Sequence, residues 1–145
     1  MGQKASPKLL RLTTVEEWDN NWIDTKSNFS NLILQDYRIR QFLDKELKQA
    51  GVSNIKISRN GGKTVVTIKS ARTGFILGKA GDNINRITKK IHQLISKNIL
   101  LNVVEEKNAE TSSQLLAENV AQQIEKRIPF RRAMKSAIQT AMKAG

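Results

Sequence analysis

A pair of glycines three residues apart, Gly78 and Gly81, limits the folds open to this chain more than any other feature of the sequence. Lys79 and Ala80 lie between them, an apolar segment precedes them, and a helical pattern follows. Glycine adopts positive φ angles and lacks a Cβ, so such a pair allows a tight turn and a close approach of another backbone. A simple bend, a nucleotide-phosphate loop and a grip on a nucleic-acid backbone would each account for it.

Spacing argues against the nucleotide-phosphate loop. That loop needs G-x-x-x-x-G-K-[ST] between a strand and a helix, so that amides surround the phosphates and a hydroxyl binds magnesium. Gly74 to Gly78 is one residue too short, and Ala80 stands where the hydroxyl should be. The alternative at residues 62–64 has Ile57 in place of the first glycine and precedes a predicted strand. The glycine spacing does not match the G-x-G-x-x-G fingerprint of dinucleotide-binding folds either. Nucleotide hydrolysis is therefore not expected.

Hydrophobic periodicity predicts an α+β domain over residues 28–106, between an extended arm (1–27) and a helical extension (107–145). The order within the domain is α-β-β-α-α-β, which gives a three-stranded mixed sheet packed against helices. We expect helices over 29–50, 72–77 and 82–97, and strands over 52–59, 63–70 and 99–104.

Local signals support these limits. Ser27 or Asn28 can cap the first helix, and Gly51 ends it where a left-handed residue is favoured. A hairpin turn is expected at residues 60–62. In the extension, the capping box at 111–114 predicts one helix, and a second helix follows Pro129.

Two tryptophans stand four residues apart in the arm, among acidic residues. Trp18 and Trp22 could stack on nucleic-acid bases, but the neighbouring carboxylates favour packing on the domain. We therefore expect both indoles to pack.

The charge balance indicates a polyanionic partner. The chain carries 25 lysines and arginines against 13 acids, which gives a net charge of +12, and no acid follows Glu125. Nucleic acid is the first expectation, because each basic contact releases counterions, and an anionic membrane surface is the second. Residues 1–6 also match the myristoylation pattern, which keeps the membrane alternative open.

Catalysis finds little support. There is no cysteine, His92 is the only histidine, and Glu105 and Glu106 would point to opposite faces of an extended segment. No spacing suggests a metal site, and we expect neither cofactor nor small-molecule substrate.

Two groups of basic residues are candidates for contacts with a polyanion. The first surrounds the glycine pair and lies mostly opposite the isoleucine stripe of the following helix. The second lies in the extension, on the face opposite the apolar residues of the last helix. Either group could instead be an ordinary solvated face. The first group comprises Arg72, Arg86, Lys89, Lys90 and Lys97; the second comprises Lys126, Arg127, Arg131, Arg132 and Lys135, with Lys143 further along.

The glycine pair, taken with its surroundings, resembles the G-x-x-G loop of the type II KH fold. The order α-β-β-α-α-β with G-x-x-G between the second and third helices is the pattern of that fold. The resemblance implies a clamp on a nucleic-acid backbone at Gly78, Lys79, Ala80 and Gly81. A glycine turn with Lys79 solvated remains the alternative, and Asp82 places a negative charge beside the expected phosphate.

Several segments together resemble a wider family, that of the third protein of the small ribosomal subunit in bacteria and organelles. These are residues 1–4, Trp18 and Trp22, and the segments 37–43, 71–74, 78–81 and 131–135. The resemblance implies a type II KH domain that binds small-subunit rRNA in the head, within the ribosome of a bacterial cytoplasm or an organelle. It also implies that the second basic group faces mRNA at the entrance of its channel, and that other small-subunit proteins are neighbours.

The family continues into a second α/β domain, and we expect this chain to lack it. A free-standing KH protein that acts on RNA and a basic membrane-surface protein are the alternative functions.

Overall fold

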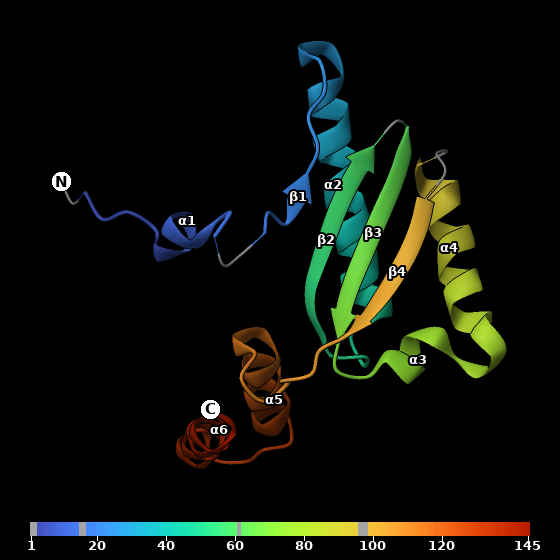
Figure 1. The fold of residues 1–145 in the computed structure, drawn as a ribbon. Helices are drawn as coiled ribbons and strands as arrows, with labels where there is room; N and C mark the ends of the chain where they lie inside the picture. The colour runs from blue at the N-terminus through green and yellow to red at the C-terminus, as the bar shows by residue number, and fades with distance from the viewer. Residues whose placement is uncertain (1–2, 15–16, 61, 96–98) are drawn as a thin grey trace.

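The computed structural model describes residues 3–14, 17–60, 62–95 and 99–145, so the expectations for Lys97, Gly61 and the first two residues lie outside it. Figure 1 shows an arm, a sheet with helices against it and two C-terminal helices, which confirms the predicted α+β fold. The elements are α1 (Pro7–Arg11), β1 (Asn20–Asn21), α2 (Lys26–Glu46), β2 (Val52–Asn60), β3 (Lys63–Ser70), α3 (Thr73–Leu77), a 3-10 turn η1 (Lys79–Gly81), α4 (Asp82–Ile95), β4 (Ile99–Glu105), α5 (Ser113–Glu125) and α6 (Phe130–Ala144).

The sheet is mixed, in the order β1-β2-β3-β4. The hairpin of β2 and β3 is antiparallel, whereas β3 with β4 and β1 with β2 are parallel. The expectation of three strands was wrong by one short strand. Asn20 and Asn21 pair with Ile57 and Ser58 of β2, and the Ile57 N–H donates to the Asp19 carbonyl at 2.9 Å. Asparagine has a low propensity for strands, so residue type does not predict β1. The strand forms only because the arm runs beside β2.

One face of the sheet and the stripes of two helices form the core. Alternate residues of β2 and β3 point to this face, and Ile55 pairs with Ile68 while Ile57 pairs with Val66. Helices α2 and α4 cover this face in Figure 1. Each fully buried aliphatic side chain contributes about 1.5–3 kcal/mol. The core residues from the helical segments are Ile39, Leu43 and Leu47 before the β2–β3 hairpin, and Ile76, Ile87, Ile91 and Ile95 after it.

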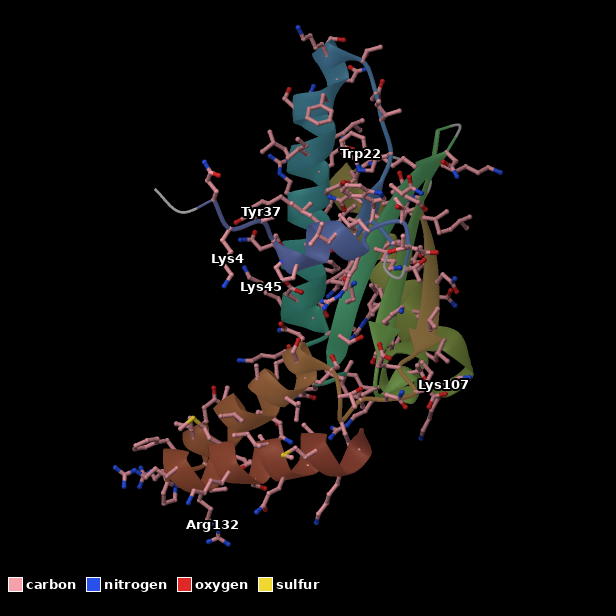
Figure 2. All side chains as sticks on the ribbon, turned by 60° about the vertical axis from the view of Figure 1, so that its left-hand side comes forward. Lys4, Trp22, Tyr37, Lys45, Lys107 and Arg132 are labelled. Atoms are coloured by element: carbon pink, nitrogen blue, oxygen red, sulfur yellow. The ribbon has the colours of Figure 1, made fainter. Side chains whose placement is uncertain are left out.

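A buried polar contact joins the arm to this core. The Trp22 Nε1–H donates to the Asp36 carboxylate at 2.7 Å, and Arg59 forms an ion pair with the same carboxylate. Asp36 is only 3% exposed, and the Arg59 guanidinium lies 5.6 Å from the Trp22 ring. Figure 2 shows Trp22 between α2 and the sheet. The expectation that this indole packs on the domain is confirmed.

For Trp18 the same expectation was wrong. Its side chain is 53% exposed and lines a depression on the other face of the sheet, with Lys56, Ser58 and Thr67. The helices of the domain cover the opposite face, and the described residues leave about half of this indole exposed.

Helix ends differ from the predicted ones in three places. The first long helix begins after Thr25 rather than Ser27 or Asn28. It ends at Glu46, with Leu47 at its C-cap, so Gly51, whose φ is 64°, ends the turn that follows the helix and not the helix itself. The capping box does not form, because the Thr111 hydroxyl donates to the Asn108 carbonyl and Gln114 donates to Glu118. Helix α5 therefore starts one residue later, with Ser112 at its N-cap.

Candidate nucleic-acid interface

The G-x-x-G loop joins α3 to α4 through η1. The Gly78 N–H donates to the Gly74 carbonyl at 2.9 Å and ends α3, and the Asp82 N–H donates to the Lys79 carbonyl. Gly78 and Gly81 have φ angles of 71° and 84°, in the region that favours glycine. A tight turn at this pair is therefore present, as the sequence predicted.

Gly81 offers an open approach to the backbone. A Cβ added there would meet its nearest atom, the Ile84 Cγ2, at 3.9 Å, which is an ordinary contact distance. Helix α4 begins at the next residue, so the positive end of its dipole lies beside the loop. An anion that approaches this side would meet this dipole end and the exposed Lys79.

Four basic residues near the loop have free charges. Arg72, Lys79, Arg86 and Lys89 are exposed, and none has an ion-pair partner within the described part of the chain. Arg72 precedes α3, Lys79 lies in η1, and Arg86 and Lys89 lie in α4, and all four side chains are on the surface. They can therefore neutralise phosphates without first breaking a bond inside the protein.

Lys90 differs from these four. Its Nζ forms an ion pair with Glu46 of α2 and lies 5.9 Å from the Phe42 ring. The hydrogen bond from Lys90 lowers the pKa of Glu46 below its ordinary value. Sequence reasoning missed Glu46, because 44 residues separate the two charges. Lys90 is thus partly neutralised inside the protein.

The second basic group lies at the turn between α5 and α6 and along α6. Lys126, Arg127, Arg131, Arg132 and Lys135 are all exposed, and the described residues offer none of them an acidic partner. Arg132 points away from the rest of the molecule in Figure 2. The first turn of α6 contains no acid, so its helix dipole adds to the positive potential. Arg131, Arg132 and Lys135 line a shallow depression with Ser136 and Gln139.

The turn before α6 holds an arginine in an unusual conformation. Arg127 has a φ of 63°, and its N–H donates to the Ile124 carbonyl at 2.8 Å. The Ile128 N–H donates to the Gln123 carbonyl at 3.1 Å, which completes a Schellman motif. Glycine is the usual residue at this position, because it has no Cβ to clash in this conformation. This chain instead places a charged arginine side chain there.

The opposite face of α6 is apolar and largely uncovered. Of the apolar residues expected on this face, only Ala133 is buried. Four large side chains of the same face are exposed: Phe130, Met134, Ile138 and Met142.

Two other kinds of site are absent from the described ranges. These residues contain no group of histidines and acids that could hold a metal ion. No helix within those ranges is long and apolar enough to cross a membrane.

Comparisons with known proteins bear on fold and family. The KH domain family matches residues 38–111, which include α3, the G-x-x-G loop, α4 and β4. Proteins named small ribosomal subunit protein uS3 match the whole chain: those of Clostridium perfringens and Clostridium tetani at 48% identity and that of Clostridium botulinum at 47%. The chain spans 66% of the length of each.

These names are those of ribosomal proteins. The chain belongs to the KH domain family, and over all of its residues it is similar to the uS3 proteins of the small ribosomal subunit.

Proposed function

We propose that this chain is an RNA-binding component of the small ribosomal subunit, located on the ribosome and bound to small-subunit rRNA. The observation that carries the proposal is the set of unpaired cations around the G-x-x-G loop of a KH domain. The similarity to uS3 proteins over the whole chain supports the ribosomal setting. Neighbouring small-subunit proteins are the expected protein partners.

The loop would act as a passive electrostatic clamp. A sugar-phosphate backbone can approach Gly81 closely, because no side chain stands in the way. Lys79 and the cations of α4 neutralise phosphates without reading the base sequence. Affinity should therefore fall steeply with salt, by a slope of about 0.7–0.9 for each phosphate contacted.

A double aspartate variant tests the loop. Lys79→Asp with Ala80→Asp places negative charge where the phosphate would lie, so affinity for small-subunit rRNA should fall and its salt dependence should flatten. The matched control is Lys26→Asp with Ser27→Asp, which changes the net charge equally at the distant N-terminus of α2. Equal affinity of the loop and control variants, with both folded by circular dichroism, would refute the role of the loop.

Sedimentation separates the ribosomal function from a free-standing RNA-binding protein. The chain is mixed with small subunits that lack their own uS3 and is centrifuged through a gradient at moderate salt. Co-migration with the subunit supports the proposal. Protein that stays at the top, while it still binds isolated RNA, would favour the free-standing alternative. Binding to anionic vesicles instead of RNA would favour the membrane-surface alternative.

Within this proposal, the second basic group meets mRNA at the entrance of its channel. This group lies on the turn before α6 and on α6 itself, and none of its residues has an ion-pair partner in the described part of the chain. Exposed guanidinium groups such as those of Arg131 and Arg132 suit a moving phosphate backbone. Neutralising Arg131, Arg132 and Lys135 together should slow translation of structured messages more than of unstructured ones. If the variant failed to join the small subunit at all, these residues would be assembly contacts with rRNA instead.

A further inference from the structure

The first glycine of the loop is packed against a side chain of the protein itself. A Cβ added to Gly78 would lie 2.9 Å from both Cβ and Cγ of Asn83, closer than real Cβ atoms approach their neighbours. Gly81, in contrast, has almost open space on the corresponding side. The two glycines of the loop therefore serve different purposes: one admits a ligand and the other admits Asn83.

The same asparagine ties the two ends of the loop together. The Asn83 Nδ2–H donates to the Phe75 carbonyl at 3.2 Å, so one side chain of α4 bridges back to α3 across the whole G-x-x-G segment. The amide stands against Gly78 on the way, and the side chain is half-buried. Without Asn83, the Phe75 carbonyl near the end of α3 would accept a hydrogen bond only from water or from a backbone N–H at the helix end.

We infer that Asn83 is a positioning residue, which holds the G-x-x-G loop in its RNA-binding conformation before RNA arrives. The inference rests on the proposed function of the loop. Gly78 has φ 71° and ψ −175°, a sparsely populated conformation that surrounding contacts must hold, and a fixed loop loses less conformational freedom on binding. Asn83 thus raises affinity without touching a phosphate.

The test compares Asn83→Ala with Asn85→Ala, its exposed neighbour on α4, in the full 145-residue chain. Hydrogen exchange of the Gly78 and Asp82 amides, both hydrogen-bonded in the loop, reports its order in the free protein. Affinity for a small-subunit rRNA fragment is measured over a range of salt concentrations. Amides of the β2–β3 hairpin and the melting temperature monitor the fold.

Asn83→Ala should raise exchange of the two loop amides about fivefold and weaken RNA binding about fivefold, as expected for loss of one hydrogen bond of ordinary strength. Its salt slope should equal that of the wild type, because no phosphate contact is removed. Lys79→Ala should behave in the opposite way: unchanged loop exchange and a slope smaller by about 0.7–0.9. Asn83→Asp keeps the shape but cannot donate to the Phe75 carbonyl, so its loop amides should exchange as fast as those of Asn83→Ala.

Three results would overturn the inference. Unchanged loop exchange with weaker RNA binding would make Asn83 a direct RNA contact. Faster loop exchange with unchanged binding would show that loop order is irrelevant to RNA. No change in either would leave the asparagine without a role. If the wild-type chain bound no RNA, the proposed function would fall, while the exchange comparison would still decide whether Asn83 restrains the loop.

Discussion

Replacing Arg127 by glycine should make the protein more stable and, at the same time, a weaker RNA binder. Arg127 has a φ of 63°, and the left-handed conformation costs an L-residue about 1–2 kcal/mol. Glycine removes this cost, but its greater conformational freedom in the unfolded chain lowers the free energy of unfolding by about 0.4–1 kcal/mol. The net gain is about 0–1.6 kcal/mol, with a midpoint of about 0.8 kcal/mol, which raises the melting temperature by about 2–3 °C in a chain of this size.

The RNA side of the prediction follows from the lost charge. If Arg127 contacts one phosphate, the salt slope of Arg127→Gly falls by about 0.7–0.9, so the wild type loses about threefold more affinity between 50 and 200 mM salt. Calorimetry and a salt titration of RNA binding measure the two effects. The control is Lys126→Ala, which removes the neighbouring charge at a residue whose φ is −78° and should not raise the melting temperature.

A melting temperature that falls in Arg127→Gly would refute the claim of backbone strain. An unchanged salt slope would refute the RNA contact. Because the two effects have opposite signs, a general loss of structure cannot produce both.

Three further measurements, on two variants, test the surroundings of the site. Glu46→Gln should strengthen RNA binding and steepen its salt dependence, because Lys90 loses its partner inside the protein; unchanged binding would show that Lys90 does not reach RNA. The pKa of Glu46 is lowered in the folded state, so the stability that this ion pair contributes is present above about pH 4.5 and is lost as the pH falls below it. Urea titrations should therefore show the stability of Glu46→Gln approaching that of the wild type as the pH falls from about 6 to about 3. Trp22→Phe removes a hydrogen bond to the buried Asp36 and should destabilise the chain by about 1.5–3 kcal/mol, whereas a change below about 0.5 kcal/mol in urea unfolding would contradict the buried contact.

The elements of the domain were predictable because local patterns agree with the tertiary structure. Alternating Val65 to Ile68 and the turn at 60–62 specify a hairpin, and the observed β3 has the predicted limits. Ile87, Ile91 and Ile95 of α4 repeat at helical spacing and lie buried as that spacing requires. The glycine pair has positive φ at both positions, as the tight turn expected there requires.

Features that depend on distant parts of the chain could not be predicted. Strand β1 exists because the arm passes along the edge of β2, and its two asparagines favour no strand. The ion pair of Lys90 with Glu46 joins two helices, so the basic face of α4 looked uniformly free in the sequence. Asn83 is an ordinary residue of a first helical turn until Phe75 and Gly78 are placed beside it. Trp18 and Trp22 have similar neighbours in sequence, and only the fold separates them.

The most direct test of the account is photo-crosslinking of the protein to rRNA within the small ribosomal subunit, with the crosslinked peptides identified by mass spectrometry. The account predicts crosslinks in two segments, residues 72–90 around the G-x-x-G loop and residues 126–135 at the start of α6. Crosslinks confined to the arm or to the open face of the sheet, with none in either segment, would contradict it.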